Sequence, residues 1–150
     1  MLNEFFEWLQ NTDLAFEIGA TWWFPFLESI HVVGVVCLVG SILMVDLRVL
    51  KLAALRYPLT PFMRELTPWS WLGFGLAVVT GAGMFITRPT HYAQNPAFLT
   101  KLVLLLLAGV NLLWFHKSSR AAQENKLAAA CSLLLWAAAV IAGRWTGHLN

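Results

Sequence analysis

The sequence predicts an all-α integral membrane protein, a transmembrane four-helix bundle preceded by an amphipathic helix in the membrane interface. Of its 150 residues, 59% are hydrophobic and only 12% are charged, about half the charged share of an average soluble protein. The mean hydropathy is +0.66. The apolar residues gather in four stretches, each close to the roughly 20 residues that cross a bilayer as a helix. We therefore expect one transmembrane domain over residues 1–150.

The first segment, residues 1–20, is expected to be amphipathic. Apolar residues recur there at helical spacing, opposite polar ones: Leu2, Phe5, Phe6 and Leu9 against Asn3, Glu4, Glu7 and Gln10. Such a segment is too polar to cross a membrane and suits the interface. Because its polar face is acidic, packing against the bundle is the simpler reason for it to lie there.

Four spans follow, at about 24–50, 69–87, 98–116 and 127–147. Trp22 and Trp23 mark the headgroup level before the first span. The stretch between the first two spans holds three prolines and is expected to be a surface loop. Gly73, Ala77 and Gly81 form a ridge of small residues on the second span, which would let either another helix or a flat ring approach the backbone.

Basic residues set the expected orientation. Seven lie toward the face that holds the loop between spans one and two and the loop between spans three and four: Arg48, Lys51, Arg56, Arg64, Lys117, Arg120 and Lys126. Three lie toward the opposite face: Arg88, Lys101 and Arg144. By the positive-inside rule the first side is cytoplasmic. We expect a multi-pass protein of a bacterial inner (plasma) membrane with both termini extracytoplasmic.

The first span carries ionisable groups at membrane depth. On a helical wheel of about 100° per residue, Glu28, His31 and Asp46 fall within roughly 60° of one another. A buried ionisable group in a membrane is expensive and usually serves as a ligand, relay or ion pair. We therefore take His31 as the first candidate for function, and expect Asp46 to be structural, in an ion pair with Arg48 or with loop arginines.

Helix direction decides which histidines can share a site. His31 and His148 both fall near the outer ends of their spans, and His91 and Met84 are substitute ligands at that level. His116 ends the third span on the inner side, roughly 20 Å from His31 by helix rise. His116 and His31 therefore cannot bind one metal ion together, and the role of His116 stays open.

The favoured hypothesis is haem b between helices near the outer face. Haem iron in an electron-transfer cytochrome takes two axial ligands, typically His with His or Met. His31 with His148 is the pair that depth permits, and Arg88, Lys101 and Arg144 lie where anionic propionates would emerge. Copper is the alternative cofactor, since His, Met and Cys are ligands that copper takes. A cofactor-free structural subunit is the third hypothesis.

Several stretches carry a resemblance to known proteins. The run His31–Gly40, the Asp-Leu-Arg ending at Arg48, the Asn-Pro-Ala-Phe from Asn95 and the Trp-Phe-His ending at His116 resemble small uncharacterised four-helix bacterial membrane proteins. More distantly, the layout is similar to four-helix b-type cytochromes, including the quinone-coupled superoxide oxidase class, and to the copper-resistance membrane domain. The resemblance implies electron transfer across or at the outer face of the membrane, with quinone and a periplasmic redox protein as candidate partners beside the lipid bilayer.

Other function classes find no support in the sequence. Cys37 and Cys131 both lie in apolar runs, so they do not suggest a disulfide framework. A net charge of +2 and the absence of a basic cluster beside aromatic residues give no support to nucleic-acid binding. There is no Ser/His/Asp constellation and no phosphate-binding glycine loop. A homo-oligomer is compatible with the sequence.

Overall fold

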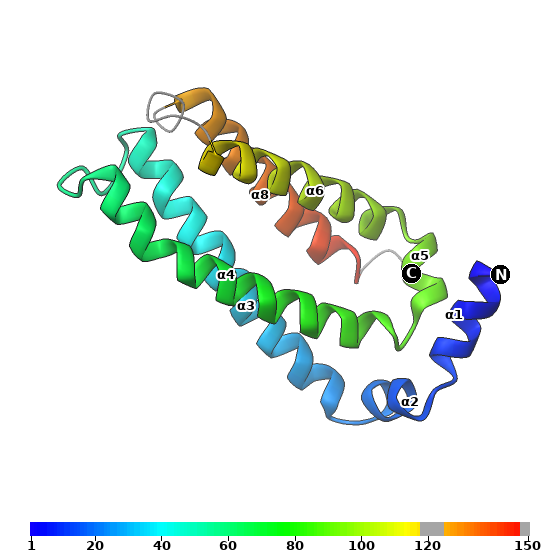
Figure 1. Ribbon diagram of the computed structural model, residues 1–150. Coiled ribbons are helices and arrows are strands. Elements are labelled where there is room, and N and C mark those ends of the chain that lie inside the picture. Colours follow the sequence, from blue (N-terminus) through cyan, green and yellow to red (C-terminus); the bar gives the residue numbers. More distant parts are fainter. Residues whose placement is uncertain (118–124, 148–150) are drawn as a thin grey trace.

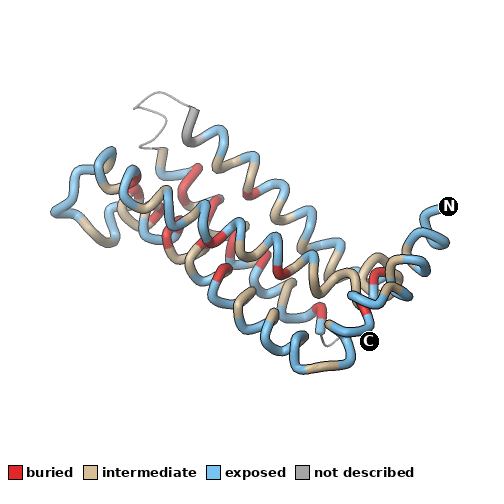
Figure 2. The backbone as a smooth tube through the Cα atoms, turned by 60° about the horizontal axis from the view of Figure 1, so that its bottom comes forward, coloured by how far each residue is buried: buried red, intermediate tan, exposed pale blue. Residues whose placement is uncertain are grey.

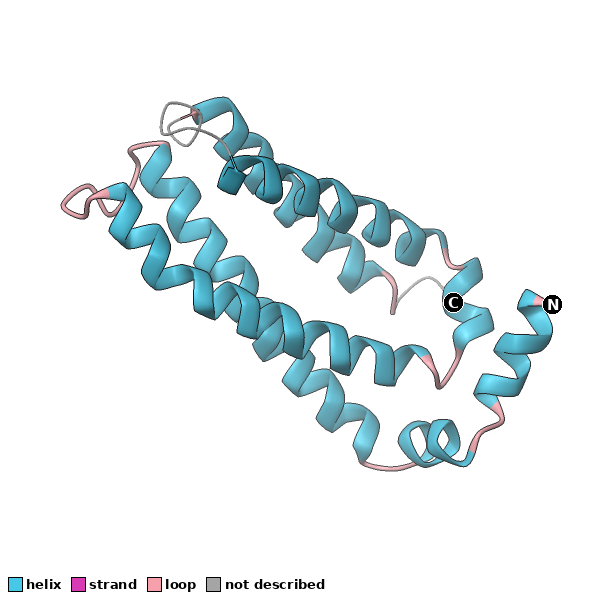
Figure 3. Ribbon diagram, viewed as in Figure 1, coloured by secondary structure: helices cyan, strands magenta, loops and turns pink. Residues whose placement is uncertain are grey.

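The computed structural model describes residues 1–117 and 125–147, with the backbone alone at 115–117. Every regular element in this part of the chain is an α-helix, as Figure 3 shows. The bounds are α1 Leu2–Gln10, α2 Asp13–Ala20, α3 Trp23–Val49, α4 Leu59–Phe85, α5 Pro89–Gln94, α6 Pro96–Lys117 and α8 Lys126–Trp145. The all-α prediction is confirmed for the described residues.

The long helices form two antiparallel pairs. Helix α3 packs along α4, and α6 packs along α8; a smaller contact between α3 and α8 joins the two pairs (Figure 1). The short helices α1, α2 and α5 lie together at one end, next to the N-terminal ends of α3 and α6. Because each pair is antiparallel, the C-terminal ends of α4 and α8 lie at this end as well.

Three of these helices are long and apolar enough to cross a membrane: Trp23–Val49, Pro96–Trp114 and Lys126–Trp145. Much of their apolar surface faces outward; Val103, Leu106 and Val110 on α6 are all more than half exposed. Figure 2 shows buried positions only at intervals along the helices, with exposed residues between them. Apolar helix surface of this extent is stable in lipid and costly in water. Helix α4 has a similar length but is more polar, because Pro68, tryptophans and several glycines interrupt its apolar run.

Two glycines bring α3 and α4 into close contact. A Cβ atom added to Gly73 would lie 2.5 Å from the Gly34 carbonyl oxygen and 2.5 Å from the Leu38 amide nitrogen. Small residues permit such backbone approach between membrane helices. Gly73 of the predicted small-residue ridge thus serves plain helix packing, and Gly81 lies beside the His31 ring, where an added Cβ would be 3.2 Å from Cε1.

Two boundaries differ from the prediction. Residues 59–68, expected in a surface loop, form the first part of α4. Pro61 is tolerated because amides of the first helical turn have no intrahelical partner. Pro68 lies inside the helix. The hydroxyl of the preceding Thr67 donates to the Met63 carbonyl at 2.8 Å. The N-terminal segment is two helices, because the Thr12 hydroxyl accepts from the Ala15 amide and starts a new helix.

The close contact makes a prediction about stability. Gly73→Ala should lower the free energy of unfolding by about 1–3 kcal/mol, because the new methyl group meets rigid backbone of α3. Gly75→Ala is the matched control on the same helix, since nothing lies within 4 Å of the added atom; alanine there should leave stability unchanged or raise it by up to about 1 kcal/mol. Equilibrium unfolding in detergent, followed by circular dichroism, measures both. Equal stability of the two variants would contradict the contact.

Candidate functional site

A large cavity lies between the two helix pairs. Its volume is about 1510 Å³, above the roughly 300–1,000 Å³ of ordinary ligand sites. All four long helices contribute to its wall, which is mostly apolar with a few polar groups near its two ends. A wall of this composition suits a large, mainly apolar ligand held by a few polar contacts.

The cavity brings together the predicted site residues that the structure describes. Its wall includes His31 of α3, Met84 of α4, Arg88 at the N-cap of α5, His91 of α5, Lys101 of α6 and Arg144 of α8. His148 lies outside the described residues, although its neighbour Gly147 borders the cavity. His116 is in the last turn of α6, at the opposite end of that helix from Lys101, and its side chain lies outside the description.

His31 is held by helix α4. Its Nδ1 atom lies 3.0 Å from the Thr80 hydroxyl oxygen, and that hydroxyl lies 2.6 Å from the Leu76 carbonyl. A carbonyl only accepts, so the single Thr80 proton goes to Leu76 and Thr80 accepts from His31. In the neutral ring Nδ1 then carries the proton and Nε2 carries the lone pair. An imidazole that donates from one nitrogen to a fixed acceptor is the usual arrangement of a metal ligand.

Charged groups of both signs surround His31. Glu28 and Lys101 are its charged neighbours, and Lys101 comes from α6 across the cavity. The Lys101 side chain lies along α8, where an atom added to Gly143 would be 3.5 Å from its Cδ and Cε atoms. Arg144 follows directly on α8. This end of the cavity therefore offers cations from both helices of the second pair.

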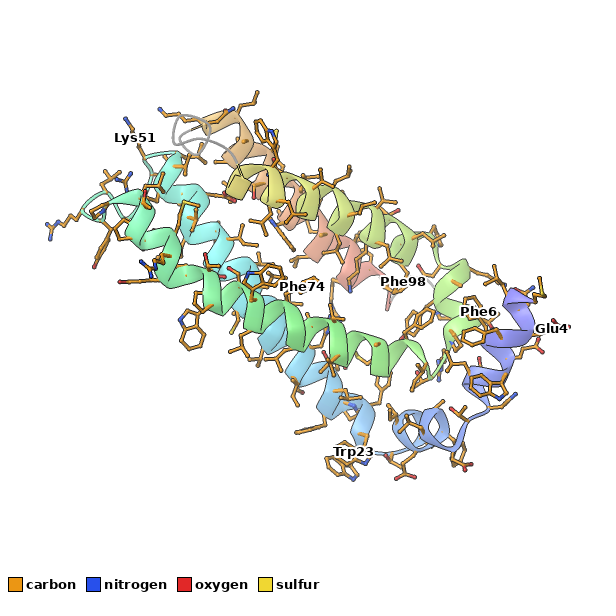
Figure 4. The ribbon with its side chains drawn as sticks, viewed as in Figure 1. Glu4, Phe6, Trp23, Lys51, Phe74 and Phe98 are labelled. Atoms are coloured by element: carbon orange, nitrogen blue, oxygen red, sulfur yellow. The ribbon has the colours of Figure 1, made fainter. Side chains whose placement is uncertain are left out.

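Aromatic rings close the same end. Phe85 of α4 has ring neighbours on three other elements, with centroid distances of 6.0 Å to Phe6, 6.1 Å to Tyr92 and 5.7 Å to Phe98. Figure 4 shows Phe6 and Phe98 at this end. Burial raises the pKa of Tyr92 above its usual value of 10.0, and the nearby Glu28 carboxylate adds to the effect while Arg88 opposes it. Tyr92 is therefore a neutral phenol at physiological pH.

The other end of the cavity holds a second polar group. Asp46 is 4% exposed and its carboxyl group is hydrogen-bonded to the Ser132 hydroxyl on α8. The predicted Asp46–Arg48 ion pair is wrong: Arg48 donates from Nε to the Tyr57 carbonyl at 2.8 Å. Residues two apart point to different sides of a helix, so Asp46 faces α8 while Arg48 faces the loop.

Two residues of the site were not candidates from sequence. Thr80 sits in a run of small and apolar residues, and only its partner at His31 shows its role. Trp136 falls within the fourth predicted span and was given no function, yet the residue borders the cavity and its buried Nε1 has no partner in the described part of the chain. A polar residue within an apolar span was the available signal for Thr80.

The fold and the cavity define an all-helical protein with three helices able to span a membrane and a large ligand-sized cavity between its helix pairs. The chain belongs to DUF6644, a family of unknown function, whose model matches residues 5–149. Comparison with curated proteins and comparison with solved structures each gave no match.

The geometry predicts the tautomer of His31. In the metal-free protein at neutral pH, ¹⁵N NMR of labelled histidine should show Nδ1 protonated and Nε2 unprotonated. Thr80→Val removes one acceptor, while the Ala77 backbone hydrogen bond remains, and should shift part of the ring population toward the Nε2–H form. Thr87→Val is the control, because the Thr87 hydroxyl donates to the Met84 carbonyl and not to a histidine. A wild-type ring protonated mainly at Nε2 would contradict the hydrogen-bond assignment.

Proposed function

We propose that this protein is a membrane b-type cytochrome that transfers electrons across or at the outer face of the membrane, with haem b in the cavity and His31 as one axial ligand. The observation that supports this best is the Thr80 contact, which leaves Nε2 unprotonated on a histidine that borders the cavity. Axial haem ligands are imidazoles of this kind.

The residues around His31 fit an anionic, mainly apolar cofactor. Arg88, Lys101 and Arg144 supply cations at one end of the cavity, where charge-assisted hydrogen bonds to carboxylates are strong. The aromatic cluster around Phe85 and the apolar middle of the wall exclude water. Haem, when bound, supplies one-electron chemistry; the chain supplies the ligand, the anchoring cations and the dry surroundings.

The second axial ligand is proposed to be His148, which follows the cavity-lining Gly147. Met84 and His91 border the same cavity and are the alternatives. His116, at the other end of α6, is excluded from the same iron by its distance along that helix. Quinone and a periplasmic redox protein are the proposed electron partners.

We also propose how the protein sits in the membrane. Helix α4 packs along the length of α3, which supports four crossing helices in one bundle. Large apolar residues of α1 and α2 are exposed, among them Phe5, Trp8 and Phe16, which supports a place in the interface for these helices. The excess of basic residues beyond the opposite ends of the long helices favours a bacterial inner membrane with the His31 end extracytoplasmic.

Copper binding is the second candidate. His31, Met84 and His91 share one cavity wall, and imidazole with thioether is a ligand set that copper takes. The described residues contain no group of three or more His, Cys, Asp or Glu side chains placed to hold a metal, so a copper site here would draw on Met84 or on His148 beside the two histidines.

An absorbance spectrum tests the proposal. The purified protein should show a Soret band and about one haem per chain by the pyridine haemochrome assay. His31→Ala should lose the band, because one axial ligand is missing, and added imidazole should restore part of it. His148→Ala should lose the low-spin spectrum, whereas Met84→Leu and His91→Ala serve as controls that keep it.

Other outcomes are equally definite. A colourless wild-type protein with full helicity that binds copper supports the second candidate. A protein that takes up neither cofactor is a structural subunit, and the cytochrome proposal is then wrong. Loss of the low-spin spectrum in Met84→Leu or His91→Ala, with His148→Ala unaffected, keeps haem but changes the second ligand.

A further inference from the structure

The α3–α4 loop, residues 50–58, presents apolar and cationic side chains together. It lies at the end of the long helices opposite to α1, α2 and α5 (Figure 1). Three of its apolar side chains are exposed, by 71%, 60% and 59%: Leu52, Leu55 and Tyr57. Its two basic side chains, Lys51 and Arg56, are exposed as well. Apolar side chains gathered in one short exposed segment mark a contact with lipid or with another apolar surface.

Hydrogen bonds to α3 hold this loop in one shape. The Leu52 amide donates to the Leu47 carbonyl at 2.9 Å, and the next amide back donates to the Arg48 carbonyl at 3.2 Å. These two bonds form the Schellman closure of a helix C-terminus. The Arg48 side chain also donates from Nε to the Tyr57 carbonyl at 2.8 Å, which ties the far side of the loop to α3. The exposed side chains are therefore presented by an ordered backbone.

Lys51 occupies the position at which this closure favours glycine. Its φ angle is +61°, in the left-handed region that glycine adopts freely and a residue with a Cβ atom adopts at a cost. Such a residue is retained for what its side chain does. The Lys51 side chain is exposed and points away from the bundle (Figure 4). It complements the negative end of the α3 dipole and leaves its ammonium group open to an anion.

Positive charge dominates the chain around the loop. Residues 47–66 hold four basic residues and one acidic residue: Arg48, Lys51, Arg56 and Arg64 against Glu65. In the part of the chain that the structure describes, the ion pair present joins the Met1 amino group to Glu4, so the loop cations have no carboxylate partner there. Four or more basic residues directly beyond a membrane helix are typical of a site for anionic lipid headgroups.

We propose that the α3–α4 loop binds an anionic phospholipid. Lys51 and Arg56 bind the phosphate of the headgroup, and the three exposed apolar side chains enter the boundary of the acyl chains. An acidic soluble protein would match the cations but leave the apolar side chains in water, so lipid satisfies both halves of the surface. The site lies at the opposite end of the long helices from His31 and goes beyond the proposed function, because it needs no haem.

Native mass spectrometry of the full-length protein in detergent tests the inference, with dioleoyl phosphatidylglycerol and dioleoyl phosphatidylcholine as probes. The wild type should bind phosphatidylglycerol more tightly. Lys51→Gly should weaken that binding about fivefold, and Lys51→Gly with Arg56→Gln about thirtyfold, as expected for one and two cations lost near a lipid surface. Phosphatidylcholine binding should not change in either variant. Leu52→Ser with Leu55→Ser should weaken the binding of both lipids, because the acyl chains are the same.

Controls separate the charge from the fold. Lys51→Gly suits the positive φ angle, so its melting temperature by circular dichroism should not fall below that of the wild type. Lys51→Arg keeps the charge and should keep the affinity. Arg56→Gln alone, in which the strained position is untouched, is the second test and should weaken phosphatidylglycerol binding about fivefold.

Three results would overturn the inference. The first is equal affinity of the wild type for the two lipids. The second is unchanged phosphatidylglycerol binding in the folded double variant, which would leave Lys51 to the dipole of α3 alone. The third is displacement of the lipid by millimolar inorganic phosphate, which would show a site for free phosphate. The Soret band, recorded on the same samples, should be equal in all variants, so the lipid site and the haem are judged separately.

Discussion

The approach of α3 to α4 at Gly34 and Gly73 is the constraint on which the rest of the structure depends. With no side chain between the two backbones, hydroxyl groups can reach from one helix to the other on both sides of the contact. The Ser41 and Ser70 hydroxyls meet at 2.7 Å toward one end, and His31 meets Thr80 at 3.0 Å toward the other. The position and tautomer of the candidate ligand therefore follow from two glycines, of which Gly34 lies about one turn from His31 on α3 and Gly73 about two turns from Thr80 on α4.

The cavity results from unequal contacts between the two helix pairs. Within the described residues, the substantial contact between the two helix pairs is that of α3 with α8, whereas α4 has no comparable contact with α6. Polar bonds close the second pair on itself, from Asn111 to the Ala128 carbonyl and from Asn95 to the Thr146 carbonyl. Two well-joined pairs that meet along one line leave an opening beside that line, and the predicted site residues border it.

Much of the fold could be predicted from the sequence because membrane helices are specified by local composition. The four apolar stretches lie within α3, α4, α6 and α8 apart from a few residues at their ends, and helix direction alone put His31, Arg88, Lys101 and Arg144 at one end. The start of α4 was missed because prolines in a first turn also occur in loops. The partner of Asp46 could not be predicted, since the choice between Arg48 and α8 depends on how the helix pairs meet.

The polar groups within the long helices divide into two kinds, and the division separates packing from function. Those of Ser41, Thr80 and Asn111 are satisfied by another part of the chain, as expected for residues that join helices in an apolar environment. Asp46 Oδ2 and Trp136 Nε1 are instead buried without a partner among the described residues, and Asp46, Trp136 and His31 are residues of the cavity wall. Burial of an unmade hydrogen bond costs stability, so Asp46 and Trp136 gain less from their positions than the polar residues that join helices. Helix joining therefore accounts for Ser41, Thr80 and Asn111 and does not account for Asp46 and Trp136.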